Sequence, residues 1–496
     1  MIRYVSMLCL CTFALIQTPA SAGKYFDVSY LARDAYQKSL SLRFDEARIT
    51  LEQMKRAEPD NLMAIFFENY VDFLTIFIDD DEAAYNKKVK IMDARIVKMS
   101  RGDHSSPYYL YTQAEIRLQS AILRGRFGNY LTGLSDVKQA YALLEENQRR
   151  FPTFIANQKS LGVMHALIGN IPDDYKWAVK AVGGMKGSVD QGIRELEDVL
   201  NTAKTTDFVF EEETLVAYCF LQIYLNNQSE KAWNTLKNSK LNPKNNPLAA
   251  YAMANMALKT GRTDEALTIL QQSPTGTVYH TLHYKNFLIG LGKLYRLDTD
   301  ANKYLEAFVN NFKGKNAVKE AYQKLSWYQL VNGNESGYWT NMGYVKSKGS
   351  DQSDPDKAAL REAKSGEMPD PTLLKARLLF DGGYYKRAYD LLKDKSGQYN
   401  TQRKNKLEYT YRLGRIAHKM GKPSEGILYY TQTIDNGSQE PWYFACNAAL
   451  QMGILYEEKK DNKNAKLAYQ KCLKINPEEY ASSLHTKAKA GLSRLK

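Results

Sequence analysis

The sequence predicts an all-α protein, an α-solenoid made of antiparallel helix hairpins. Small residues flank short Gly-containing turns repeatedly along the chain, at the spacing of a two-helix unit. Long runs of alternating apolar and polar residues, which would indicate strands, are nearly absent. The chain has 496 residues, too many for one ordinary core unless the protein is modular.

Composition is that of a folded protein with an excess of positive charge. Hydrophobic residues make up 44% and charged residues 25%, with a mean hydropathy of −0.50. These values exclude a disordered chain and a membrane bundle. The net charge is +13, but acidic residues are interleaved with the basic ones. Without a dense basic run carrying aromatic residues, the charge pattern disfavours nucleic-acid binding.

The first 22 residues, 1–22, have the pattern of a secretory signal peptide. Arg3 is the only charge before Lys24, and the apolar stretch 5–16 is too short to span a bilayer. The small residues Ala-Ser-Ala at 20–22 form a cleavage site. A short membrane anchor is the alternative. We expect export to the periplasm, the outer envelope or the medium.

The clearest repeat unit spans residues 446–477. Gly453 and Ala465 are small, so two antiparallel helices can approach closely, while Tyr456 and Tyr469 fill the wider gaps. The final proline of this segment ends the second helix. The pattern resembles the tetratricopeptide repeat, a two-helix unit of about 34 residues. The resemblance implies a right-handed superhelix with a concave groove lined by first helices.

Weaker copies of the unit divide the remaining chain. Gly183, Gly184 and Gly187, together with Pro172, cannot all lie inside regular helices, so they predict an interruption. An irregular α-helical domain is the alternative to the solenoid. We expect N-terminal helical repeats at 23–150, an irregular helical insert with a Gly-rich turn at 151–200, middle repeats at 201–340, a linker with a short helix at 341–371, and C-terminal repeats with a capping helix at 372–496.

The groove is the expected functional surface. The chain contains 35 tyrosines, whose aromatic body and polar tip suit a contact surface. With Leu407 as the first position of a unit, the inward positions of two neighbouring units are Glu408, Tyr411, Arg415, His418, Lys419, Asn447, Leu450, Ile454 and Glu458. The sequence therefore predicts a non-enzymatic scaffold of the cell envelope that binds a protein or peptide.

A second hypothesis uses the positive charge. Lys176, Trp177, Lys180 and Lys186 surround the Gly-rich turn and would suit contact with lipid headgroups. A buried tryptophan beside solvated lysines is the alternative explanation. The chain would then be a peripheral membrane or envelope-polysaccharide binder, whose binding weakens steeply with salt.

Motifs for catalysis, cofactors or metals are weak. The turn at 183–188 lacks the Gly-Lys-Ser/Thr order of a phosphate-binding loop. His280 and His283 could share a helix face as metal ligands, but no acidic residue is close to them in sequence. No nucleophile with a base is identifiable, so an enzyme with a site in 151–200 is the third hypothesis. We expect no catalytic residue, cofactor or metal.

Cys446 and Cys472 are predicted to be neighbours. Each lies seven residues from the small residues of its helix, Gly453 and Ala465, in opposite directions. Antiparallel packing therefore places the two thiols at the same height between the two helices. In an exported protein they could form a disulfide. The alternative is a pair of small buried residues that never oxidise.

Overall fold

The computed structural model describes residues 23–169 and 183–495, and every regular element in these stretches is a helix. Their only β-type pairing is an isolated bridge between Tyr25 and Asn61. Within the described stretches, no helix combines the length and apolar character needed to cross a membrane. The predicted all-α class is confirmed for these residues. The predicted signal peptide at 1–22 lies outside them.

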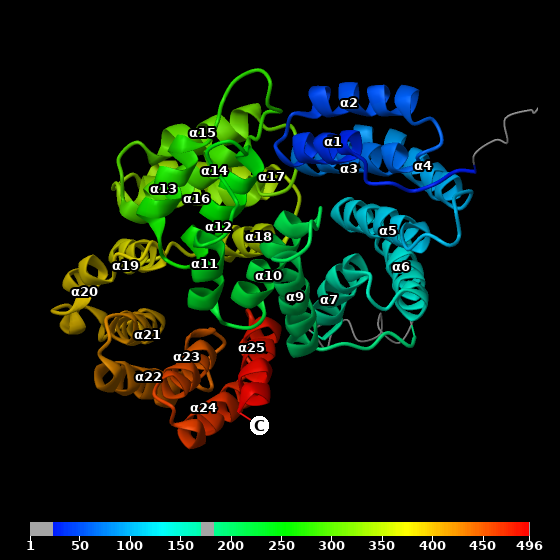
Figure 1. Cartoon of the computed structure of the whole chain (residues 1–496). Helices are drawn as coiled ribbons and strands as arrows, with labels where there is room; N and C mark the ends of the chain where they lie inside the picture. Colours follow the sequence, from blue (N-terminus) through cyan, green and yellow to red (C-terminus); the bar gives the residue numbers. More distant parts are fainter. Residues whose placement is uncertain (1–22, 170–182, 496) are drawn as a thin grey trace, which may run out of the picture.

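Consecutive helices form antiparallel hairpins along the chain (Figure 1). The first half contains α1 (Tyr30–Leu40), α2 (Phe44–Ala57), α3 (Met63–Asp79), α4 (Glu82–Met99), α5 (Tyr108–Arg126), α6 (Tyr130–Arg150), α7 (Ile155–Gly169), α9 (Val189–Ala203), α10 (Glu211–Tyr224) and α11 (Ser229–Lys237). The second half contains α12 (Pro247–Lys259), α13 (Thr263–Gln272), α14 (Tyr284–Arg296), α15 (Ala301–Asn311), α16 (Val318–Val331), α17 (Glu335–Ser347), α18 (Asp354–Ser365), α19 (Pro371–Asp381), α20 (Tyr385–Leu392), the short 3₁₀ helix η2 (Ser396–Tyr399), α21 (Arg403–Lys419), α22 (Pro423–Gly437), α23 (Phe444–Glu458), α24 (Asn462–Lys474) and α25 (Ala481–Arg494).

A common turn joins the two helices of several hairpins. Gly261, Gly333, Gly383 and Gly421 each follow a first helix and adopt φ values between 71° and 87°. This left-handed backbone ends the helix and costs glycine little, because glycine has no Cβ. In the last hairpin Lys460 takes the same place, with φ of 61°. These turns are the Gly-containing turns from which the hairpins were predicted.

The first helices of successive hairpins pack side by side in an inner row. From the middle of the chain onward this row runs through α10, α12, α14, α16, α19, α21, α23 and α25. The row curves back until α25 lies near α9 and α10 (Figure 1). Arg494 donates a hydrogen bond from Nη1 to the carbonyl of Asn226 at 3.1 Å, and Ser493 Oγ lies 3.2 Å from Asp190 Oδ2. The C-terminal helix thus closes the row against the middle of the chain.

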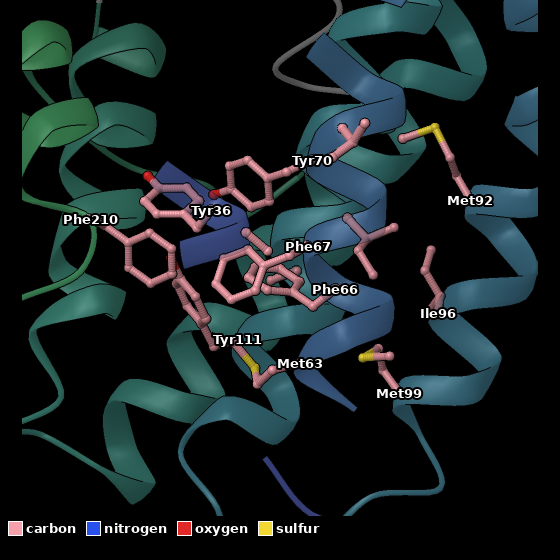
Figure 2. Close-up of a cluster of buried hydrophobic side chains, with 14 of the residues drawn as sticks. Tyr36, Met63, Phe66, Phe67, Tyr70, Met92, Ile96, Met99, Tyr111 and Phe210 are labelled. Carbon is pink, nitrogen blue, oxygen red and sulfur yellow. The ribbon is translucent and has the colours of Figure 1, made fainter. Parts of the chain in front are cut away.

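A large hydrophobic core fills the N-terminal half (Figure 2). It is centred on α3, with side chains of α4 on one side and of α1, α5 and the start of α10 on the other. The Tyr36 and Phe210 rings pack edge to face with centroids 5.4 Å apart. The ten labelled side chains are all buried: Tyr36, Met63, Phe66, Phe67, Tyr70, Met92, Ile96, Met99, Tyr111 and Phe210.

Two predicted segments depart from simple hairpins. In the predicted insert at 151–200, residues 183–188 form no helix, and α9 begins at Val189 with Ser188 as its N-cap. The predicted linker at 341–371 contains the end of α17 and all of α18. Ala359 and Ala363 of α18 are buried in a core shared with α16 and α17, so this segment is packed structure. The predicted division into domains remains a prediction.

Candidate functional site

The residues predicted to line a groove lie on α21 and α23, two adjacent helices of the inner row. They fall into three exposure classes: buried Tyr411, His418 and Leu450; half-buried Glu408, Arg415, Asn447 and Ile454; exposed Lys419 and Glu458. Tyr411 and Leu450 are each only 1% exposed and belong to the core between the helices. The prediction that these two face an open groove is wrong, because neighbouring inner helices cover them.

Tyr411 nevertheless positions the polar groups beside it. Its hydroxyl accepts hydrogen bonds from Arg415 Nη1 at 2.8 Å and from Asn447 Nδ2 at 2.7 Å. The Arg415 guanidinium also lies over the ring of Phe380, with Cζ 4.6 Å from the centroid. Among the described residues only one of the five N–H donors of Arg415 is used in a hydrogen bond. A fixed guanidinium therefore keeps most of its donors for another group.

A second pair of predicted residues links the same two helices. His418 Nε2 lies 2.9 Å from Glu458 Oε2, and His418 Nδ1 lies 3.1 Å from the hydroxyl of Tyr430. The hydrogen bond with His418 lowers the pKa of the Glu458 carboxyl, against the effect of burial. Lys419, the exposed neighbour, adds a positive charge with the same effect. The structure therefore brings together most of the predicted polar residues, in two small networks.

Sequence reasoning missed five basic residues that accompany Arg415: Lys259 of α12, Lys324 of α16, Arg377 of α19, Arg412 of α21 and Lys487 of α25. The charges of several of them act on the pKa values of the others. Burial lowers the pKa of Lys487, and the charges of Arg415 and Lys259 lower it further. Burial also lowers the pKa of Lys324 to about 8, with Arg377 and Lys259 acting in the same direction. No local spacing could reveal this group, because its members come from distant hairpins.

Three of these six cations have acidic partners, and three do not. Lys324 lies 3.8 Å from Glu320, Arg377 lies 3.8 Å from Asp381, and Arg412 lies 2.6 Å from Glu408. Lys324 and Arg377 also stack on the ring of Trp327, at 3.8 and 4.6 Å. Within the described part of the chain, no ion pair involves Lys259, Arg415 or Lys487. We call these three residues the inner cations.

A different charged group lies in the N-terminal half, where five helices meet. Lys159 Nζ of α7 is 3.1 Å from Glu115 Oε2 of α5 and 2.5 Å from Glu213 Oε1 of α10. The Tyr36 hydroxyl of α1 donates to Glu213 at 2.9 Å, and the Tyr70 hydroxyl of α3 lies 3.4 Å from it. Burial alone would lower the pKa of Lys159, but the two carboxylates raise it well above its ordinary value. We call these side chains the Lys159 cluster.

The region of the enzyme hypothesis contains a pocket of about 350 Å³ between α6, α7 and α9. His165 lies in its wall, with Nδ1 2.6 Å from Glu195 Oε2. The remaining lining residues are Glu145, Gln148, Arg149, Gln158, Leu161 and Asp198. On the other side of its ring, His165 Nε2 lies 3.4 Å from the hydroxyl of Tyr141.

The two histidines considered as metal ligands contact different residues. His280 Nε2 lies 2.7 Å from Asp79 Oδ1, an acidic partner that sequence distance concealed. His283 instead lies near Phe312, with the two rings tilted and their centroids 6.2 Å apart. Within residues 23–169 and 183–495, no group of three or more His, Cys, Asp or Glu side chains has the arrangement of a metal site.

Of the residues predicted to contact a membrane, only Lys186 can be placed. It is exposed, and its carbonyl accepts a hydrogen bond from the Tyr141 hydroxyl at 3.3 Å. Lys176, Trp177 and Lys180 lie outside the described residues. The membrane contact therefore stays a prediction.

Cys446 and Cys472 face each other between α23 and α24. Their sulfur atoms are 3.6 Å apart, and both residues are free thiols with no exposed surface. The hydrogen bond with Cys446 raises the pKa of the Cys472 thiol, and burial raises it further. Oxidation of the pair stays a prediction.

Comparison with known proteins identifies one repeat. Residues 447–479 match the family model described as a tetratricopeptide repeat. A structure of Naa15/Naa10 bound to HypK-THB is similar at 13% identity and a TM-score of 0.24, over 91% of this chain and 64% of that chain. A crystal structure of the APC/C hetero-tetramer Cut9-Hcn1 is similar at 12% identity and a TM-score of 0.28, over 94% of this chain and 99% of that chain.

The chain thus spans less than two thirds of the first of these two chains. At such TM-scores neither structure bears on the path or the function of this chain. No curated protein matches the sequence significantly.

Proposed function

Because the chain carries a tetratricopeptide repeat at 447–479 within an all-α solenoid, we propose that it is a non-enzymatic protein-binding scaffold of the cell envelope. It binds a protein or peptide segment on the inner side of its C-terminal hairpins. The observation that carries this proposal is the fixed Arg415 guanidinium. It is held by Tyr411, which Asn447 of the matched repeat also contacts, and its remaining N–H groups form no hydrogen bond with the residues that the structure describes. Arginine in such a setting is a typical anchor of a protein interface.

The envelope location is supported by the signal-peptide pattern of the first 22 residues. It predicts that the native protein begins after Ala22. N-terminal sequencing of protein isolated from its source tests this, and an intact N-terminus with the first 22 residues retained would contradict it.

Binding is tested with the mature chain immobilised and exposed to solubilised envelope proteins from its source. Proteins identified by mass spectrometry are then purified and titrated singly. We expect one of them to bind saturably and Arg415→Ala to weaken it by about tenfold or more. Arg194→Ala is the matched control, because Arg194 is exposed on α9, outside the inner row. Equal affinity of both variants and wild type would overturn the assignment of this surface.

Salt separates this proposal from a peripheral membrane or polysaccharide binder. The net charge of +13 would attract anionic lipids or acidic glycans, and that attraction is screened within about 8 Å at physiological ionic strength. Binding to anionic vesicles that disappears at high salt, together with no saturable protein partner, would favour the second function. A protein complex anchored by the inner face keeps most of its affinity at the same salt concentration.

A further inference from the structure

The contacts between the helices of the inner row form a closed circuit. From α10 through α12, α14, α16, α19, α21 and α23 to α25, each helix packs on the next. The end of α25 then returns to α9 and to the end of α10 (Figure 1). We call this last contact the closing junction.

Every junction before the closing one shares an apolar core. Buried residues of α10, α12, α14 and α16 belong to one hydrophobic cluster. Trp327 of α16 and Leu374 of α19 belong to a second cluster, and Phe380 of α19 and Leu413 of α21 to a third. The last cluster joins α21, α23 and α25, with Leu484 as a member from α25. These junctions are therefore held by buried apolar surface, the dominant favourable contribution to folding.

The closing junction differs because its contacts are polar. Arg494 Nη1 donates to the carbonyl oxygen of Asn226 at 3.1 Å and lies 3.3 Å from Oδ1 of the same residue. The second contact is the hydrogen bond between Ser493 and Asp190. Among the described residues, no side chain of α25 belongs to the hydrophobic cluster that contains α9, α10 and α11. Water competes for polar contacts, so this junction opens at a lower free-energy cost than the others.

One guanidinium connects the two sides of the closing junction. Arg494 Nε and Nη2 donate to the two carboxylate oxygens of Glu457 at 2.7 and 2.9 Å, so the side chain is fixed on α23 by a bidentate pair. The remaining nitrogen, Nη1, reaches Asn226 just beyond the C-terminal end of α10. The carbonyl groups at that end of a helix carry partial negative charge, which favours a cation. We call Arg494, Glu457 and Asn226 the C-terminal clasp.

A chain of buried side chains holds the receiving side of the clasp. Asn226 Nδ2 donates to Gln222 Oε1 at 2.9 Å, and Gln222 Nε2 donates to the hydroxyl of Tyr218 at 2.8 Å. The Tyr218 hydroxyl in turn donates to Glu197 of α9 at 2.6 Å. These bonds fix the acceptor atoms of Asn226 independently of Arg494. Two pre-formed sides that meet through polar contacts are suited to a hinge motion.

We propose that the C-terminal clasp is a gate, which opens to admit a segment of a partner protein to the inner side of the circuit and then closes on it. This inference rests on the proposed function, because Arg415, the anchor of that function, belongs to α21 of the same circuit. Helices that share a core stay together, so the closing junction is where the circuit parts. The closed state dominates in the free protein, and the open state is a minor population.

Opening is measured as a distance between α11 and α25 in the full mature chain. Spin labels are attached to Asn234→Cys and Ser483→Cys, both at exposed positions, and the native cysteines of a chain that begins at Gly23 are buried. Electron–electron resonance then gives the distribution of distances. We expect Arg494→Gln to raise the population of a second, longer distance by about tenfold, because it removes the charged hydrogen bonds of the clasp.

Arg403→Gln is the matched control. Arg403 also binds a carboxylate, that of Glu440, and a backbone carbonyl, that of Asn436 at 3.1 Å, but both partners lie in or next to the adjacent α22. Its loss should leave the distances unchanged. Identical distributions for Arg494→Gln and Arg403→Gln would overturn the proposal. A longer distance accompanied by a loss of helical circular dichroism would mean that α25 unfolds, and would overturn it as well.

A locked chain tests whether binding needs the gate. Asp190→Cys and Ser493→Cys replace side chains whose oxygen atoms lie 3.2 Å apart, and a short bismaleimide joins the two thiols. The probe is the purified protein partner obtained in the capture experiment above, and surface plasmon resonance follows its association. We expect the joined chain to bind at least tenfold more slowly than the same double variant without the reagent, and Arg494→Gln to bind faster than wild type.

The outcomes separate this inference from the function on which it rests. If the joined and unjoined chains bind the partner at equal rates, the gate is overturned and the proposed function survives. If no captured protein binds the wild-type chain, the proposed function fails and the gate fails with it.

Discussion

The Lys159 cluster and the inner cations show two ways in which one chain uses charge. Lys159 has two carboxylates within 3.1 Å, and tyrosine hydroxyls satisfy the second carboxylate further. The inner cations are drawn from equally distant helices but have no acidic partner among the described residues. The first group holds five helices of the N-terminal half together.

The difference has opposite consequences for stability. Removing one member of a closed buried cluster leaves the remaining charges without compensation, and that loss is large. Removing one member of a group of like charges relieves repulsion. Substitutions in the two groups should therefore change the free energy of unfolding in opposite directions.

The largest expected effect is on the closed group. Lys159→Met keeps the apolar stem but leaves the buried Glu115 and the half-buried Glu213 without a cation. We expect the variant to lose about 3–5 kcal/mol of unfolding free energy, measured by urea denaturation. Lys386→Met removes an exposed lysine paired with Asp390 and should cost less than about 0.5 kcal/mol. Similar losses in both variants would mean that the Lys159 cluster is no more than a surface ion pair.

Local features of the fold were predictable from the sequence because they depend on neighbours within one hairpin. Gly453 and the ring of Tyr469 were placed in one helix pair by their spacing, and the structure packs them together. The proximity of Tyr411, Arg415 and Asn447 follows from the same register across two units. The burial of Tyr411 did not follow, because it depends on how closely the next inner helix approaches.

The inner cations were not predictable from the sequence for a related reason. The C-terminal helix reaches α9 and the end of α10 because small rotations between successive hairpins accumulate along the row. Each rotation depends on the packing of many side chains, and an error at any hairpin displaces the end of the row. Hairpin patterns are therefore visible in a single sequence, whereas contacts between distant hairpins are not.

The second prediction concerns a disulfide in the last hairpin, where no charged cluster joins the two helices in the way the Lys159 cluster does in the N-terminal half. Cys446 and Cys472 are positioned to form a disulfide under a mild oxidant, and the bridge should stabilise the fold by about 3 kcal/mol in the chain-entropy picture. Thiol counting and intact mass before and after oxidation measure the reaction. Cys219 is the control, since it is equally buried and has no cysteine neighbour among the described residues. In a chain that begins at Gly23, three thiols remaining after oxidation would leave the pair as packing residues.

The third prediction concerns Lys324, a buried cation that has both acidic and basic neighbours and is therefore intermediate between the Lys159 cluster and the inner cations. Burial lowers the pKa of Lys324 from 10.5 to about 8. The charges of Arg377 and Lys259 also lower this pKa, whereas those of Glu320 and Glu362 raise it. Between these two pH values the unfolded chain holds a proton that the folded chain has released. The contribution of Lys324 to stability therefore rises with pH across this window, by about 2–3 kcal/mol.

Lys324→Met removes this dependence. We expect the variant to be more stable than wild type at pH 7 and the difference to shrink as the pH approaches 10, measured by urea denaturation at each pH. The subtraction of the two curves cancels the titration of other groups. A difference that is constant with pH would show that the pKa of Lys324 is not lowered in the folded chain.

The smallest effect tests whether close packing fixes α23, the helix that lies between α21 and α25 in the inner row. A Cβ at position 453 would lie 2.5 Å from the ring of Tyr469, which is itself buried. Gly453→Ala must push α23 and α24 apart or move that ring, so we expect a loss of about 1–2 kcal/mol by thermal or urea denaturation. At Gly343 in α17 a Cβ would meet nothing within 4 Å, so Gly343→Ala should gain about 0.5–1 kcal/mol from the better helix former. Opposite signs for the two substitutions follow only if close approach of the helices at Gly453 is a real constraint. A gain in stability at both positions would show that α23 and α24 tolerate a wider separation. The C-terminal hairpins would then be less tightly packed than the helices around the Lys159 cluster.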